Sequence, residues 1–195
     1  MPRKPRQESS TGIYHWITRG INRRALFHFK KDYLFFLDLV KTHTDERQIK
    51  VFHYCLMPNH IHMLLHAPSI GDLSHFSHYV KRRYAYYHSK TTGHNGASFE
   101  RMYKSIPVET ETYLLDCARY IERNPLRANL AKRLEDYPYS SYCVHAFKEQ
   151  SDLIVASEAY QALADNDVER QKRYAEYVSV IRTQEEYASA DPFGG

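Results

Sequence analysis

The sequence is 195 residues long and has few cysteines, few glycines and no long hydrophobic run. Its three cysteines, Cys55, Cys117 and Cys143, are odd in number and form no Cys-x-x-Cys pair, so neither a disulfide framework nor a thiolate zinc site is indicated. No stretch approaches the ~20 apolar residues of a membrane span, and no apolar signal-peptide segment follows the basic N-terminus. We therefore expect a reduced, cytoplasmic protein without a membrane partner.

Several motifs and segment types are also missing. The sequence has no Walker loop, no Gly-rich nucleotide cradle and no His-Glu-x-x-His segment, which gives no support to a nucleotide hydrolase or a zinc protease. It has no internal repeat, no low-complexity segment and no Gly/Ser-rich linker, and its length suffices for one well-buried core. We expect one domain over residues 1–145, followed by an acidic helical tail over residues 146–195.

The charged residues are unevenly distributed, although the net charge is only +4. Residues 1–31 carry eight Lys and Arg against one acid, whereas residues 145–195 carry ten acids against five bases. A second basic cluster is interleaved with aromatic residues: Lys81, Arg82, Arg83, Tyr84, Tyr86, Tyr87, Lys90, Phe99, Arg101, Tyr103 and Lys104. Stacking on aromatic rings contributes ~1–3 kcal/mol per unpaired base, and basic side chains bind the phosphate backbone. The cluster indicates nucleic-acid binding; the alternative is that its tyrosines pack a helix on the core and its charges are solvated.

Residue patterns predict four strands and three main helices. Runs of β-branched and aromatic residues indicate strands, and apolar residues spaced three and four apart indicate amphipathic helices. The expected strands cover residues 12–19, 49–56, 60–66 and 99–108. The expected helices cover residues 30–47, residues 72–92 and a segment from Thr110 through Ile121, with a further tail helix at 167–182. This order predicts an α+β fold, a ferredoxin-like or RRM-like βαββαβ sandwich with a four-stranded antiparallel sheet and a C-terminal helical extension.

Two histidines, His60 and His62, lie inside an apolar segment just after Met-Pro-Asn. Successive side chains of a strand point to opposite faces, so the two histidines share one face while Ile61 and Met63 point to the other. Two neutral imidazoles roughly 6.5 Å apart along the backbone can converge on one divalent ion. The spacing suggests a metal site, and two structural histidines without a metal are the alternative.

Tyr120 and Asn124 are four residues apart and therefore share one face of the expected third helix. This spacing joins a possible nucleophile to a possible metal ligand. A metal held by two imidazoles and an amide carbonyl keeps positions open for a phosphate oxygen and water, which suits Mg²⁺ or Mn²⁺ better than a closed zinc site. Asn124 could instead end the helix before Pro125, and Tyr120 could be a core aromatic.

These motifs, in this order and spacing, closely resemble those of the single-tyrosine HUH transposases, and most of all the REP-associated tyrosine transposase branch. The resemblance covers most of the chain, and its residues are Thr18-Arg19-Gly20 with Asn22-Arg23, the segment from Met57 to Leu64, Tyr120-Ile121-Glu122 with Asn124-Pro125 and Arg127-Ala128, and Tyr137-Pro138 with Ser140-Ser141. The resemblance implies a ferredoxin-like core, metal-dependent nicking and joining of single-stranded DNA, and recognition of hairpins in repetitive extragenic palindromes. It also implies that His60, His62 and Asn124 are metal ligands and that Tyr120 forms a 5′-phosphotyrosyl intermediate.

The expected partner is single-stranded DNA with hairpin structure, bound by a monomer or a homodimer. The expected DNA-binding residues are Arg19, Asn22, Arg23, Arg24, Lys81, Arg82, Arg83, Tyr86, Arg101, Tyr103 and Lys104. Two other functions stay open at this point. One is a non-catalytic module that binds structured DNA or RNA, and the other is a metal-dependent hydrolase that uses water in place of Tyr120.

Overall fold

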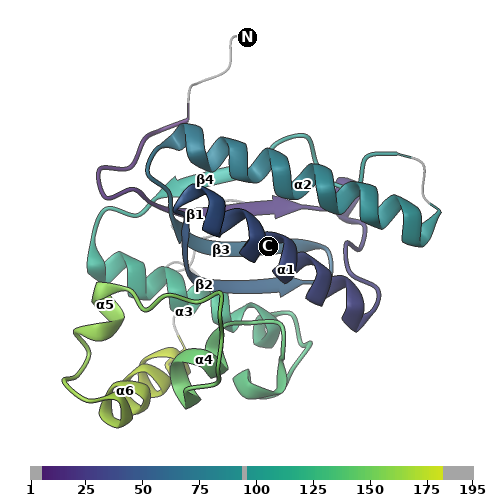
Figure 1. The fold of residues 1–195 in the computed structure, drawn as a ribbon. Coiled ribbons are helices and arrows are strands. Elements are labelled where there is room, and N and C mark those ends of the chain that lie inside the picture. Colours follow the sequence, from purple (N-terminus) through teal and green to yellow (C-terminus); the bar gives the residue numbers. More distant parts are fainter. Residues whose placement is uncertain (1–5, 94–95, 182–195) are drawn as a thin grey trace.

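A four-stranded sheet lies at the centre of the computed structural model, which describes residues 6–93 and 96–181 (Figure 1). In chain order the elements are β1 (Ile13–Arg19), the 3-10 helix η1 (Ile21–Arg23), α1 (Lys30–Arg47), β2 (Lys50–Met57), β3 (His60–His66), α2 (Ile70–Thr92), β4 (Lys104–Pro107), α3 (Glu111–Arg127), the 3-10 helix η2 (Leu134–Asp136), α4 (Tyr142–Phe147), α5 (Glu158–Gln161) and α6 (Asp167–Ser179).

All neighbouring strands are antiparallel, in the order β2-β3-β1-β4. This is the strand order of a ferredoxin-like sheet, so the fold predicted from the sequence is confirmed. The register pairs Arg19 with His60 and Ile17 with His62. The two histidines therefore lie on a central strand, beside β1.

The two faces of the sheet are covered by different helices (Figure 1). Trp16 of β1 and Met63 of β3 pack in one core with Phe36 of α1 and Phe76 of α2. Leu64 points the opposite way and packs in a second core with residues of α3. Alternate residues of β3 thus serve two cores, and His60 and His62 share the α3 side with Leu64.

The turn after β1 is bonded to the turn between β2 and β3. The Gly20 N–H donates to the carbonyl oxygen of Asn59 at 2.8 Å. A glycine is required here because a Cβ atom would lie 2.1 Å from the carbonyl oxygen of Arg24. The residue that precedes His60 is therefore held by the end of β1.

A segment that follows α3 covers the outer edge of β2. The Leu56 N–H donates to Tyr139 O at 2.9 Å, the Ser141 N–H donates to Tyr54 O at 3.0 Å, and the Tyr137 hydroxyl donates to Leu56 O at 2.7 Å. An uncovered edge strand would leave backbone N–H and C=O groups unpaired. This segment thus closes one edge of the sheet.

Helix α6 packs on α3. Arg123 of α3 donates from Nη1 to the carbonyl oxygens of Val178 and Ser179, each at 2.8 Å. Tyr174 of α6 is fully buried and donates to Glu122 Oε2 at 2.7 Å. The described part of the C-terminal extension is therefore attached to the helix that carries Tyr120, and Figure 1 shows α4, α5 and α6 grouped beside α3.

Three elements differ from the predicted bounds. The predicted strand over residues 99–108 is reduced to β4, because Phe99 makes only an isolated bridge to Gly20 before the chain turns toward the sheet. Helix α2 begins at Ile70 rather than at residue 72, because Ser69 caps it. The predicted tail helix ends at Ser179, and residue 182 lies outside the described residues.

Candidate functional site

His60 and His62 lie on the face of the sheet that α3 covers. Their ring centroids are 5.0 Å apart. His62 is buried, with 2% of its surface exposed, whereas His60 at the start of the strand is partly exposed. The pair can therefore be reached from solvent at the end of the sheet where β3 begins.

Asn59 orients the ring of His60. Asn59 Nδ2 donates to Arg23 O at 3.2 Å, which leaves its carbonyl oxygen Oδ1 to contact His60 Nδ1 at 2.6 Å. An amide oxygen only accepts, so Nδ1 of His60 carries the proton and Nε2 carries the lone pair. Metals bind the lone pair, and this arrangement therefore prepares Nε2 of His60 as a ligand atom.

His15 of β1 contacts His62 in the buried part of the site. His15 Nε2 lies 2.9 Å from His62 Nδ1. If Nδ1 of His62 donates in this bond, Nε2 of His62 holds the lone pair. Burial lowers the pKa of His62 well below its usual value, and the charges of His15, His60, Arg19 and Arg127 lower it further. His62 is therefore neutral, which is the form that binds a metal.

Helix α3 places Tyr120 beside these rings. The ring centroid of Tyr120 lies 5.6 Å from that of His62 and 5.9 Å from that of His15, and both contacts are edge-on. Tyr120 is buried, with 2% of its surface exposed. The structure thus brings Tyr120 together with the histidines of β3.

Pro125 explains how Asn124 is oriented. Proline has no N–H, so the carbonyl oxygen of Ile121 lacks its usual helical donor. Asn124 Nδ2 donates to Ile121 O at 3.2 Å and to Tyr120 O at 2.9 Å. Because these bonds use the amide nitrogen, Oδ1 is the atom that Asn124 can offer to a ligand. The helix continues through Pro125 to Arg127, so Asn124 does not end it.

Two guanidinium groups flank the site. Arg127 Cζ lies 5.2 Å from the ring centroid of Tyr120, and Arg19 is paired with His60 across the strands. Arg127 and His15 were not among the predicted site residues. Tyr120, Asn124 and Arg127 are spaced by four and then three residues, and this helical periodicity is the signal that could have identified Arg127. Positive charges in these positions favour a phosphate group.

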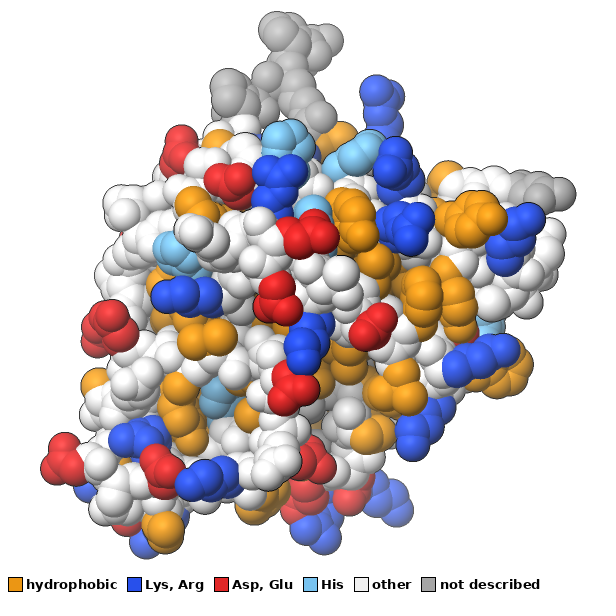
Figure 2. Space-filling view, in the orientation of Figure 1, with side chains coloured by type: hydrophobic (Ala, Val, Ile, Leu, Met, Phe, Trp, Pro, Cys, Tyr) orange, Lys and Arg blue, Asp and Glu red, His pale blue; other side chains and the backbone are white. Residues whose placement is uncertain are grey.

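The predicted DNA-binding residues fall into two groups. Figure 2 shows Lys and Arg side chains gathered at the right of the view. In Figure 1 this is the side where α1 begins and α2 ends, and it is also the end of the sheet where β3 begins. The residues near this end are Arg19, Asn22, Arg23 and Arg24, and the last three are exposed. Asn22 and Arg23 have left-handed backbone angles, with φ of 52° and 58°.

The second group lies along α2 and the segment that leads into β4. A groove of about 490 Å³ is lined by Lys81, Arg82, Arg101 and Tyr103 among others, while Arg83, Tyr86 and Lys104 lie outside its lining. Tyr86 is 66% exposed, whereas Tyr103 is only 8% exposed and contacts the guanidinium of Arg6, whose Cζ lies 3.9 Å from its ring centroid. Tyr86 is therefore the solvent-exposed ring, with Lys90 Nζ 5.7 Å from its centroid, and Tyr103 is not exposed.

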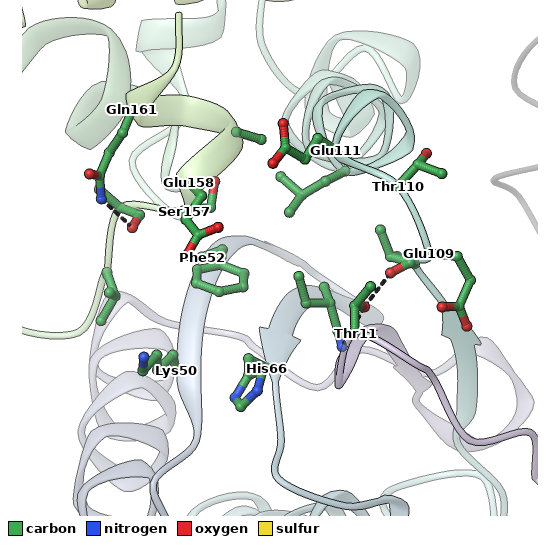
Figure 3. Close-up of a pocket in the computed structure, with 16 residues that line it drawn as sticks. Thr11, Lys50, Phe52, His66, Glu109, Thr110, Glu111, Ser157, Glu158 and Gln161 are labelled. Atoms are coloured by element: carbon green, nitrogen blue, oxygen red, sulfur yellow. Dashed lines mark hydrogen bonds between the residues drawn. The ribbon is translucent and has the colours of Figure 1, made fainter. Parts of the chain in front are cut away.

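A cavity larger than this groove lies at the opposite end of the sheet. It has a volume of about 570 Å³ and includes His66, the last residue of β3, but none of the predicted site residues. Figure 3 shows Lys50 and His66 on one side of this cavity and Glu111 and Glu158 on the other. A seven-residue strand spans roughly 20 Å, so the cavity is remote from His60.

Comparison with known proteins agrees with the fold and the order of the motifs. The family model described as "Transposase IS200 like" matches residues 8–124, which is more than half of the chain. The chain therefore belongs to the IS200-like transposase family, and the predicted recognition as a tyrosine transposase is confirmed at this level.

The solved structures that are similar to this chain include two described as transposases. One is described as a REP-associated tyrosine transposase bound to a REP hairpin. It is 16% identical in sequence, the match covers 82% of this chain and 93% of that chain, and the TM-score is 0.64. Its similarity confirms the fold. The other is a candidate transposase from Deinococcus radiodurans R1, 18% identical over 70% of this chain and 96% of that chain, with a TM-score of 0.43. No curated protein matches the sequence. Among the described residues, no helix has both the length and the apolar character needed to cross a bilayer.

Proposed function

We propose that this transposase nicks and joins single-stranded DNA through a 5′-phosphotyrosyl intermediate on Tyr120. The observation that carries the proposal is the position of Tyr120, whose ring lies 5.6 Å from that of the neutral His62. His60 lies on the same face of β3 as His62, and Asn124 follows Tyr120 by about one turn of α3. In this proposal β3 and α3, which pack against each other, would supply the nucleophile and three metal ligands.

His60, His62 and Asn124 would hold a divalent ion in this proposal. The donors are two imidazole nitrogens and one amide oxygen, a set that leaves room for a phosphate oxygen and water and suits Mg²⁺ or Mn²⁺. When bound, such an ion withdraws charge from the scissile phosphate and favours in-line attack. The prepared Nε2 atom of His60 and the oriented amide of Asn124 support this assignment.

Tyr120 supplies the nucleophile. The Tyr120 Oη–P bond forms while the bond between phosphorus and the 3′ oxygen breaks, and the phenolic proton is released as the 3′ oxygen gains a proton. Arg127 and Arg19 would stabilise the charge that develops on the phosphate. The phosphotyrosyl bond conserves the energy of the broken phosphodiester, so attack by a 3′-hydroxyl reverses the step and joins two strands without ATP.

We further propose that the substrate is a single strand that carries a hairpin. The described relative of the same fold was solved with a REP hairpin, and the basic side chains of this chain gather at the end where β3 begins. Arg19, Asn22, Arg23 and Arg24 would contact the strand next to the site, and Lys81, Arg82, Arg83, Arg101 and Lys104 would contact its backbone farther along. Tyr86 is the exposed ring on which a base could stack, while Tyr103 would shape the groove.

The proposal is tested with hairpin oligonucleotides labelled at the 3′ end, because the protein would become attached to the 5′ phosphate of the 3′ fragment. With Mg²⁺ or Mn²⁺, the wild type should form a covalent adduct that survives denaturing electrophoresis. Tyr120→Phe and His60→Ala should form none. Tyr113→Phe is a matched control, since Tyr113 lies on the same helix but outside the site.

Other outcomes of this experiment separate the alternative functions. Cleavage that persists in Tyr120→Phe would show that water is the nucleophile, so the chain would be a hydrolase. Hairpin binding without any adduct, unchanged by His60→Ala, would identify a non-catalytic binding module. Either result would overturn the proposal.

A further inference from the structure

A second group of metal-ligating side chains lies on a different face of α3. His53 of β2, Glu122 of α3 and His145 of α4 place one ligand atom each within 4.8 Å of one another. Over residues 6–93 and 96–181, this is the one group of three or more His, Cys, Asp or Glu side chains that are so close. Glu122 is two residues from Tyr120, which is about 200° around the helix, so the two side chains face different surroundings.

One histidine of this group, His145, is arranged as metal-bound histidines usually are. His145 Nε2 lies 2.9 Å from the carbonyl oxygen of Phe52, which can only accept, so Nε2 carries the proton and Nδ1 carries the lone pair. Metal-bound histidines generally donate their second nitrogen to a carbonyl or carboxylate in this way. His53 faces Glu122 with Nδ1, which lies 3.0 Å from Oε1, and its Nε2 is buried without a hydrogen-bond partner. Burial lowers the pKa of His53 and of His145 to about 3, so both are neutral.

Glu122 adds a buried carboxylate that has no positive partner. Its side chain is fully buried; Oε1 lies 3.0 Å from His53 Nδ1 and accepts from the Ser141 hydroxyl at 2.7 Å. The neighbouring arginines are bonded elsewhere, Arg119 to Asp116 and Arg123 to backbone carbonyls of α6. Among the described residues, no Lys or Arg forms an ion pair with Glu122. Buried carboxylates in proteins are generally paired or bound to a metal.

We propose that His53, Glu122 and His145 bind one divalent transition-metal ion, with zinc as the best match. Two imidazole nitrogens and a carboxylate oxygen are common zinc ligands, and the Tyr174 hydroxyl, 3.2 Å from His53 Nδ1, is positioned as a further oxygen donor. The site is too deeply buried to admit a substrate. The ion is therefore structural, and it joins β2 and α3 to α4 next to buried Tyr174 of α6. This proposal does not depend on the proposed transposase chemistry.

Burial also predicts how the ion exchanges. The three ligands are 0–2% exposed, so release requires α4 or α6 to move away from α3. His60 is partly exposed, and an ion bound there exchanges without such opening. Zinc must therefore be supplied while the chain folds, and a brief treatment with chelator should not remove it.

The test removes the first site and asks whether metal remains. The full chain with His60→Ala and His62→Ala is refolded with Zn²⁺, treated briefly with EDTA, dialysed and analysed by elemental mass spectrometry. The expected result is about one zinc per chain. Adding Glu122→Gln, which keeps the size of the side chain and removes its charge, should abolish the bound zinc. Glu46→Gln is the matched control, because the exposed Glu46 contacts His43 in a His–Glu pair outside this group.

A spectroscopic measurement makes the result independent of whether Glu122→Gln folds. Refolding of the double variant with Co²⁺ should give the visible absorption of a four-coordinate nitrogen and oxygen site, and should raise Tm relative to metal-free refolding. A folded double variant that retains no zinc and shows no cobalt spectrum would overturn the proposal. Zinc that is retained by folded Glu122→Gln would also overturn it, because the ion would then lie elsewhere.

Discussion

Replacement of His15 by Phe is expected to weaken metal binding at the proposed site of His60 and His62. The contact at issue joins His15 Nε2 to His62 Nδ1 at 2.9 Å, and both rings are buried. Phe keeps an aromatic ring in the same place but removes the nitrogen. The Nδ1–H group of His62 would then be buried without an acceptor whenever Nε2 binds a metal.

The size of the effect follows from that lost acceptor. A buried donor left without a partner costs about 1–3 kcal/mol, which corresponds to a loss of roughly 5- to 150-fold in affinity. Loss of an outer hydrogen-bond partner of a metal-bound histidine typically costs about 10- to 100-fold, which lies within the same range. We therefore expect the Kd for Mn²⁺ to rise by about one to two orders of magnitude.

Mn²⁺ binding measured by electron paramagnetic resonance would test this expectation directly. His15→Gln should restore much of the affinity because its amide oxygen can accept from His62, and His75→Ala on the exposed surface of α2 should have no effect. Thermal unfolding of each variant shows whether the fold is retained. A folded His15→Phe variant that binds Mn²⁺ within twofold of the wild type would refute the orienting role of His15.

Two further predictions concern the DNA surface and the effect of pH. Tyr86→Ala should weaken binding of single-stranded DNA by about 1–3 kcal/mol, because it removes an exposed stacking face. The Tyr103→Phe variant should bind normally, since that ring is buried. Equal losses of affinity for both variants in a fluorescence-anisotropy titration would contradict this difference. Acid should destabilise the metal-free protein. His53 and His145 have a pKa of about 3 in the folded chain, against an ordinary value of 6.5. Between pH 6.5 and 3 these histidines therefore bind protons mainly in the unfolded chain, which favours unfolding. The free energy of unfolding should fall by at most ~1.4 kcal/mol per pH unit for each histidine, and by less in practice, because Glu122 has a raised pKa and binds its proton more tightly when folded. Urea denaturation between pH 7 and pH 4 measures how the free energy of unfolding changes with pH. A free energy of unfolding that does not fall toward acid pH would show that these histidines are not buried as neutral groups.

The sheet and its helices could be predicted because their signals are local. Alternation in β3 and helical spacing in α1 and α2 depend only on which residues face a core. The same local rule placed His60 and His62 on one face, and the structure agrees with this placement. The predicted strand over residues 99–108 was too long because Tyr103 turns into the core beside Trp16, and no local pattern distinguishes such a residue from a strand residue.

The remaining parts of the site arise from contacts between distant segments. His15 lies in a strand that was recognised only by its β-branched and aromatic residues, and its contact with His62 depends on the pairing of β1 with β3. His53, Glu122 and His145 come from three elements with no common spacing, so the sequence holds no short motif that would connect them. The exposure of Tyr86 and the burial of Tyr103 are likewise set by tertiary packing.

Helix α3 connects the two proposed sites through its opposite sides. Tyr120, Asn124 and Arg127 follow one face, while Glu122 and Arg123 bond to the C-terminal helices from another. Because a helix moves as a rigid element, a shift of α3 that followed the loss of the Tyr174–Glu122 contact would also shift the phenol of Tyr120 relative to β3. A catalytic group must be held within about 0.5 Å of its productive position. The buried contacts of Glu122 and Arg123 with the extension therefore bear on the position of Tyr120, the proposed nucleophile, even though neither residue lies on the face of α3 that carries it.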